Sequence, residues 1–120
     1  MKVLIADDSH AMHMIIKRTL RLAGFEDLDV VFASDGREAL EKIRSERPDV
    51  VLSDWNMPEM SGLDVLRAVR AEGIGCHFGF VTTEATDEMR ALAKEEGAEF
   101  LIAKPFTPET FAEVLGPYLG

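Results

Sequence analysis

Short runs of apolar residues alternate along the chain with longer segments in which apolar residues recur every three or four positions. The short runs favour buried β-strands and the periodic segments favour amphipathic helices. The pattern predicts five strands, at residues 2–6, 28–33, 49–53, 76–82 and 99–103. It also predicts five helices, one between Asp8 and Gly24 and the others at residues 34–46, 62–73, 87–97 and 108–119.

This strict alternation of strand and helix predicts an α/β fold. Strands joined through helices by short connections form parallel sheets with right-handed crossovers, which place helices on both faces. No repeat, low-complexity tract or linker interrupts the chain, so residues 1–120 are expected to form a single, doubly wound domain around a five-stranded parallel sheet. In such sheets, ligands bind beyond the carboxyl ends of the strands.

Polar residues capable of chemistry follow four of the predicted strands at this edge. They are Asp7 and Asp8 after the first strand, Asp54 after the third, Thr82 and Thr83 at the end of the fourth, and Lys104 after the fifth. Three converging carboxylates repel one another unless a cation neutralises them, and ligands that are all oxygen select a hard divalent ion. Mg²⁺ is the natural candidate because it binds one or two carboxylates together with phosphate oxygens, and Mn²⁺ is expected to substitute for it.

Asp54 is the predicted nucleophile because the third strand is expected to lie centrally in the sheet. A carboxylate beside Mg²⁺ can accept a phosphoryl group and become an aspartyl phosphate. Lys104 and Thr82 would supply an ammonium charge and a hydroxyl donor to the phosphoryl oxygens. The loop "WNMPEMSG" after Asp54 would bend away and offer a backbone carbonyl, that of Asn56, to the metal.

Composition and charge narrow the classes of partner. The 13 Lys and Arg against 22 Asp and Glu give a formal net charge of −9, which disfavours binding to nucleic-acid phosphates or anionic membranes. The single cysteine, Cys76, cannot form an internal disulfide and is expected to be an apolar packing residue in a reducing compartment. No stretch has the length of a signal peptide's apolar run or of a membrane span, so a cytoplasmic location is expected.

Four motifs together resemble the receiver domain of two-component response regulators, most closely the stand-alone chemotaxis-type members. They are Asp7-Asp8, "DWNMPEMSGLDVL" from Asp54, "VTTEA" (81–85) and "KPFT" (104–107). The resemblance implies a flavodoxin-like fold with strand order 2-1-3-4-5. It also implies that a histidine kinase or a histidine phosphotransfer protein donates the phosphoryl group, and that the phosphorylated chain, expected to be a monomer, binds a downstream protein without turnover of an external substrate.

The resemblance also assigns roles to single residues. Asp8 and Asp54 would bind Mg²⁺ directly, and Asp7 would assist through a water molecule. Lys104 and Thr82 would contact the phosphoryl group on Asp54.

Three residues near the later motifs carry further expectations from the family. The peptide bond before Pro105 would be cis. Leu101 stands where the family usually has an aromatic residue that relays the signal, and Thr83 stands where a small residue is common. Phe100 should lie on the opposite face of its strand and should not replace the missing ring. We therefore expect intact site chemistry and a modest switch.

The same residues argue against two other functions and leave two alternatives open. A flavin mononucleotide carrier would need a loop of phosphate-binding amides after the first strand, where this chain has two aspartates. A phosphatase would need a pocket for a leaving group, and the short connections leave none. A phosphate shuttle or sink in a phosphorelay, and the receiver part of a longer regulator, stay open as alternatives. His10, His13 and His77 lack zinc-like spacing and are expected to be surface or packing residues.

Overall fold

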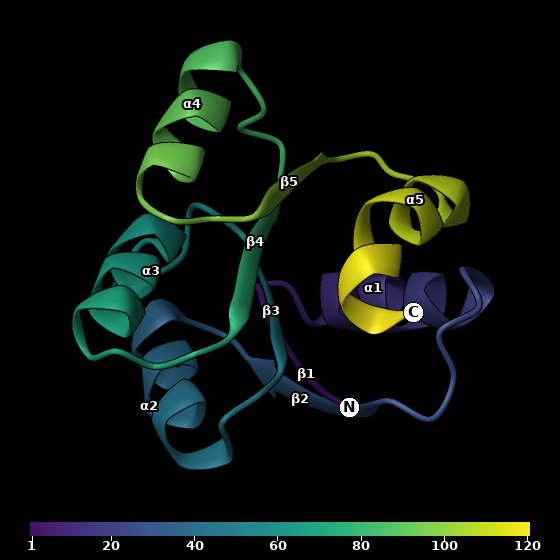
Figure 1. Ribbon diagram of the computed structural model, residues 1–120, viewed down its shortest axis with the longest axis horizontal. Helices are drawn as coiled ribbons and strands as arrows, with labels where there is room; N and C mark the ends of the chain where they lie inside the picture. The colour runs from purple at the N-terminus through teal and green to yellow at the C-terminus, as the bar shows by residue number, and fades with distance from the viewer.

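Five parallel strands form one sheet at the centre of the computed structural model, which describes residues 1–120 (Figure 1). Their order is β2-β1-β3-β4-β5, as expected. β3 is therefore the central strand, and the strand order reverses between β1 and β3, where doubly wound folds bind their ligands. The strands are β1 (Lys2–Ala6), β2 (Asp29–Ala33), β3 (Val50–Ser53), β4 (His77–Thr82) and β5 (Phe100–Ala103).

Five helices cover the two faces of the sheet, with α2, α3 and α4 on one side and α1 and α5 on the other (Figure 1). Each helix begins after a residue whose side-chain oxygen accepts a hydrogen bond from the amide three positions along. These capping residues are Ser9, Asp35, Ser61, Thr86 and Thr107. The helices are α1 (His10–Leu22), α2 (Gly36–Glu46), α3 (Gly62–Ala71), α4 (Asp87–Glu95) and α5 (Pro108–Leu119).

Three helices end earlier than the periodicity predicts, and glycine explains the difference. α1, α3 and α4 stop two residues before Gly24, Gly73 and Gly97, which have φ of 99°, 69° and 100°. Glycine adopts this left-handed conformation at little steric cost and commonly follows a helix. The glycines therefore mark the turn beyond each helix. The first residue of four predicted strands, at positions 28, 49, 76 and 99, also lies outside the observed strand.

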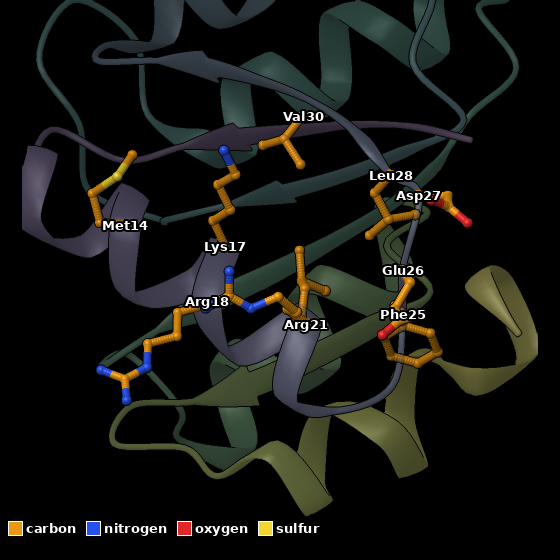
Figure 2. A pocket seen from close by; sticks show the side chains of 10 residues that line it. Met14, Lys17, Arg18, Arg21, Phe25, Glu26, Asp27, Leu28 and Val30 are labelled. Atoms are coloured by element: carbon orange, nitrogen blue, oxygen red, sulfur yellow. The ribbon is translucent and has the colours of Figure 1, made fainter.

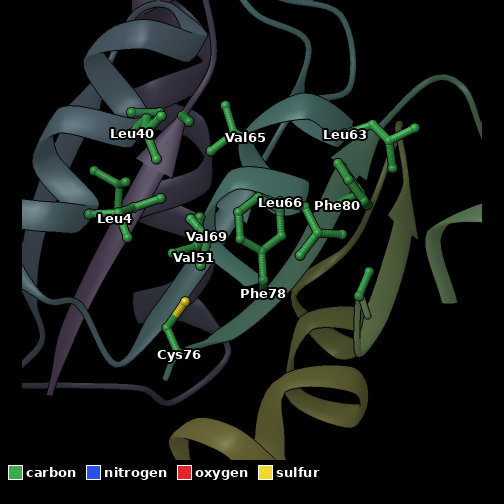
Figure 3. Close-up of a cluster of buried hydrophobic side chains, with 14 of the residues drawn as sticks. Leu4, Leu40, Val51, Leu63, Val65, Leu66, Val69, Cys76, Phe78 and Phe80 are labelled. Carbon is green, nitrogen blue, oxygen red and sulfur yellow. The ribbon is translucent and has the colours of Figure 1, made fainter. Parts of the chain in front are cut away.

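Apolar side chains fill the space on both faces of the sheet. The larger cluster has 18 buried residues and lies against α2 and α3, with contributions from α4 (Figure 3). The second has 10 buried residues and lies against α1 and α5. Leu101 packs on the larger cluster and Phe100 on the second, which confirms that these neighbours face opposite sides.

Cys76 is a packing residue, as predicted from its isolation in the sequence. It belongs to the larger cluster and is 9% exposed. Burial raises the pKa of its thiol, which keeps the group protonated at neutral pH. In the described chain no helix has the length and apolar character needed to cross a bilayer.

Candidate functional site

Backbone hydrogen bonds hold the predicted site residues at the carboxyl edge of the sheet. The amide of Asp7 donates to the last residue of β2 at 3.0 Å, and the amide of Asp54 donates to the last residue of β1 at 2.8 Å. The amide of Lys104 donates to Thr82, the last residue of β4, at 2.9 Å. Each of these residues thus continues the backbone hydrogen bonding of its strand to a neighbouring strand. The sheet therefore fixes the position of the Cα atom from which each side chain extends.

The three predicted carboxylates converge. Asp7, Asp8 and Asp54 each offer an oxygen, and these oxygens lie within 4.8 Å of one another. Asp7 is only 2% exposed, Asp54 is half-buried and Asp8 is exposed. Ligands that are all oxygen suit a hard divalent cation. The residues present therefore fit the kind of ion that the sequence predicts.

Lys104 lies between two of these carboxylates. Its Nζ donates to Asp54 Oδ2 at 3.1 Å, the predicted pair, and to Asp7 Oδ2 at 2.8 Å, which was not predicted. Partial burial lowers the pKa of Lys104, but the hydrogen bond to Asp7 and the charge of Asp54 outweigh it, so the pKa lies above its ordinary value of 10.5. Lys104 therefore stays protonated at neutral pH and acts as an internal counter-ion to the two carboxylates.

Backbone amides bind the remaining oxygens of the same two carboxylates. Asp7 Oδ1 accepts from the amide of Ser9 at 2.9 Å, and Asp54 Oδ1 accepts from the amide of Trp55 at 2.7 Å. Both side chains are thus held from two directions. The carboxylate of Asp8 makes no hydrogen bond within the chain and is exposed, which leaves its oxygens available to a ligand.

The loop after Asp54 turns back tightly because of Gly62. The amide of Gly62 donates to the carbonyl of Trp55 at 2.7 Å, and a Cβ at this position would lie 2.1 Å from the carbonyl oxygen of Asp54. Trp55 is buried and packs on Phe80 with ring centroids 4.6 Å apart. The loop is therefore anchored at both ends around the candidate nucleophile.

Asn56 lies in the exposed part of this loop. Its side-chain amide donates to Glu84 Oε1 at 3.2 Å and so links the loop to the segment after β4. The role predicted for its backbone carbonyl as a metal ligand stays a prediction.

The predicted switch residues lie on β4 and β5 and in the loop after β4. Thr82 is fully buried, and its hydroxyl oxygen accepts from the amide of Glu84 at 3.1 Å rather than contacting Asp54. Thr83 is exposed and Leu101 is half-buried. The guanidinium of Arg90 in α4 donates to the carbonyl of Leu101 at 3.1 Å. Because a hydroxyl group accepts and donates at the same time, the proton of this hydroxyl stays free to donate to another group.

Two further observations concern the surroundings of the site. The peptide bond between Lys104 and Pro105 is cis, as the resemblance implied. A cavity of about 540 Å³ lies between α1 and β2 (Figure 2). Its lining includes Lys17, Arg21 and Phe25 but none of the predicted site residues.

The sequence interpretation missed several groups that hold the site. The amides of Ser9 and Trp55 could not be assigned because backbone contacts leave no mark on residue type. Ser9 does carry a signal, since a serine before a helical pattern is a common helix cap. The histidines were expected to be surface or packing residues, and His13 is indeed buried.

Comparisons with known proteins agree on one family. The chain matches the response regulator receiver domain over residues 3–115. It is 42% identical to chemotaxis protein CheY1 of Helicobacter pylori, over 100% of this chain and 98% of that protein. It is 41% identical to a chemotaxis protein CheY homolog of Campylobacter jejuni, over 100% and 93% of the two chains. The solved structure of Vibrio cholerae chemotaxis protein CheY4 matches with a TM-score of 0.85 and 39% identity, over 98% of both chains.

Proposed function

The chain belongs to the response regulator receiver domain family, with CheY-type chemotaxis proteins among its relatives, and from this premise we propose that it is a phosphoacceptor in two-component signalling. In this proposal Asp54 takes a phosphoryl group from a phosphohistidine. The observation that carries the proposal is the convergence of Asp7, Asp8 and Asp54, with Lys104 hydrogen-bonded to two of them.

The transfer is a substitution at phosphorus. One carboxylate oxygen of Asp54 forms the new O–P bond while the N–P bond of the phosphohistidine breaks, and the imidazole nitrogen leaves with the electron pair. The amide of Trp55, 2.7 Å from Asp54 Oδ1, fixes the orientation of the carboxylate. Lys104, 3.1 Å from Oδ2, brings a positive charge to the place where the phosphoryl oxygens arrive.

Asp7, Asp8 and Asp54 would hold a divalent cation, Mg²⁺ by preference. When bound, such an ion neutralises the carboxylates and the oxygens of the transferred group. Asp8 is suited to direct coordination because its carboxylate is exposed and makes no hydrogen bond within the chain. Asp7 is less free because Ser9 and Lys104 bind its two oxygens, which fits the assisting role that the family implies.

The proposed output is a change in protein binding, with no turnover of an external substrate. Thr82 would release the amide of Glu84 and turn its hydroxyl toward the phosphoryl group, and Lys104 would follow from Asp54 to the new oxygens. The donor would be a histidine kinase or a histidine phosphotransfer protein, and the target a downstream protein. Signalling in chemotaxis is the reading that the relatives favour.

Leu101 favours a second candidate, a shuttle or sink that passes phosphate on without a strong output. The side chain lacks a ring whose two orientations a partner could recognise. Loss of the phosphoryl group to a phosphotransfer protein within seconds, with unchanged binding to downstream proteins, would support this alternative. Stable binding of the phosphorylated form to a target would support the first.

The test of the proposed function is phosphorylation by a small acyl phosphate. Incubation of the native chain with acetyl phosphate and Mg²⁺ should add one phosphoryl group, visible as a single mass increment in intact-mass spectrometry. Asp54→Asn should add none, and chelation of Mg²⁺ should abolish the increment in the native chain.

Asp64→Asn is the matched control, because Asp64 is an exposed carboxylate on α3 that does not belong to the cluster. This variant should be phosphorylated as the native chain is. Equal yield in Asp54→Asn would contradict the assignment of the acceptor.

A further inference from the structure

His13 is a buried side chain that reaches the base of the acidic cluster. It lies on α1 and is 2% exposed. Its Nε2 lies 2.7 Å from the carbonyl oxygen of Asp7 and 3.0 Å from that of Ala33. Both oxygens are acceptors, so Nε2 carries a proton and donates to them. The histidine thus links α1 to the residue that follows β1 and to the last residue of β2.

The two carbonyl groups differ in their dependence on His13. The oxygen of Ala33 also accepts the amide of Asp7, at 3.0 Å. The oxygen of Asp7 has no other donor within the chain. Removal of the histidine donor would therefore leave the carbonyl of Asp7 unpaired while that of Ala33 stays paired, and an unpaired buried acceptor is unfavourable.

Neighbouring rings fix the orientation of the imidazole. It stacks on Phe32 of β2, with ring centroids 4.9 Å apart and planes 15° from parallel. The exposed ring of His10 lies edge-on to it at 5.4 Å. The Nε2–H group is therefore held in one direction, and that direction is toward Asp7.

The carbonyl of Asp7 belongs to the peptide group that joins Asp7 to Asp8. Its orientation determines how the carboxylates of both residues approach Asp54. We propose that His13 is a positioning residue for the acidic cluster: it holds the Asp7–Asp8 peptide group in the orientation that divalent cation binding requires, without touching the cation. This inference rests on the proposed binding of Mg²⁺ at the cluster.

Two amide substitutions separate this role from simple packing. The side-chain nitrogen of glutamine can occupy the place of histidine Nε2, whereas that of asparagine can only occupy the place of Nδ1. His13→Gln should keep the Mg²⁺ dissociation constant within about threefold of the native value, because the donor to Asp7 is retained. His13→Asn should raise it by about tenfold, the size of effect seen when a group that orients a metal ligand is lost. Titration with Mg²⁺, followed by the fluorescence of Trp55 or by calorimetry, measures both.

Thr19→Val is the matched control on the same helix. Thr19 is also buried, and its hydroxyl donates to the carbonyl of Ile15 at 2.7 Å, so the variant loses one buried hydrogen bond away from the cluster. Its Mg²⁺ affinity should equal that of the native chain. A second measurement needs no metal: the amides of Asp7 and Ser9 are hydrogen-bonded, and their hydrogen exchange should be faster in His13→Asn than in Thr19→Val or His13→Gln.

The possible outcomes are distinguishable. If the native chain does not bind Mg²⁺, the proposed function fails along with this inference. If the native chain binds Mg²⁺ and His13→Asn binds it equally well, with unchanged exchange at Asp7 and Ser9, only the inference is overturned. Equal weakening in Thr19→Val and His13→Asn would also overturn it, because the loss would then reflect general destabilisation of α1.

Discussion

The side chain of Lys104 acts as a built-in cation for the acidic cluster. Its Nζ donates to Asp7 at 2.8 Å and to Asp54 at 3.1 Å. A divalent cation bound to the same carboxylates would lie close to this ammonium group, and like charges at short range repel. The lysine therefore stabilises the cluster without a metal and competes with one.

Replacement of this lysine should separate metal binding from switching. Lys104→Met is expected to bind Mg²⁺ about two- to tenfold more tightly than the native chain, because the repulsive charge is gone. It should lose most of the structural change that follows phosphorylation, because nothing then joins β5 to the phosphoryl group. Trp55 fluorescence titration measures the first effect and amide chemical-shift mapping the second.

Lys94→Met is the control, since Lys94 is exposed and makes no ion pair. Its Mg²⁺ affinity should equal that of the native chain. A large loss of Mg²⁺ affinity in Lys104→Met would contradict the competition described here.

The main residues of the site could be predicted because parallel strands place their carboxyl ends at one edge. Asp7, Asp8, Asp54 and Lys104 were found in that way, and the structure brings them together. The contact between Lys104 and Asp7 was not predicted. A lysine side chain can reach either of two adjacent carboxylates, and only the packed structure decides between them.

At the scale of strands, Gly79 and Phe100 form a cross-strand pair between β4 and β5. The ring of Phe100 lies over the glycine, so that an added Cβ would be 2.2 Å from its Cδ1 atom. The pair lies on the face covered by α5, where Phe100 also meets Tyr118 at 5.3 Å between ring centroids. Glycine is therefore needed here for space rather than for backbone conformation.

Gly79→Ala should lower the free energy of unfolding by about 2 kcal/mol, because the new methyl group displaces the Phe100 ring in a packed layer. Gly75→Ala is the comparison, since a Cβ at Gly75, in the loop before β4, meets nothing within 4 Å. That variant should raise the free energy of unfolding by about 0.4–1 kcal/mol, because alanine reduces the conformational entropy of the unfolded chain. Urea unfolding followed by circular dichroism tests both, and a change of the same sign in the two variants would be inconsistent with this explanation.

Element type was predictable from the sequence, whereas some element ends were not. The apolar runs identify all five strands, and the helical periodicity identifies all five helices. The helix errors lie at Gly24, Gly73 and Gly97 and the residue before each: that residue still donates a helical hydrogen bond, but the glycine itself has a positive φ and ends the helix. Apolar spacing reports which side of an element is buried, and it does not report where the backbone changes conformation.

At the scale of the whole molecule, the two apolar clusters lie on opposite faces of the sheet, and the predicted switch residue on β5 packs against only one of them. Leu101 packs with the cluster on the α2–α4 side, whereas Phe100 packs with the cluster on the α1 and α5 side. A rearrangement that begins at Thr82 and reaches Leu101 should therefore be largest on the α4 side of β5 and smaller on the α5 side.

The phosphorylated form should differ modestly from the unphosphorylated form at the surface formed by α4, β5 and α5. Leucine has no ring to move between buried and exposed positions, and a small structural difference permits only a small difference in partner affinity. Amide chemical-shift mapping with and without beryllofluoride is the measurement. Small changes at Leu101 are expected, and the larger ones should lie in the loop after Thr83. Large cooperative changes across residues 87–103 would show that leucine serves as a full switch.

The strand order also has a consequence for synthesis on the ribosome. The strands that end at the aspartates, β1 and β3, are synthesised before β4 and β5, but a single domain generally folds as a unit. β3 pairs with β4, and β4 pairs with β5, so the sheet is complete only when its last strand has left the ribosome. Lys104 follows directly after that strand. The three carboxylates should therefore come together only when their internal counter-ion is also present.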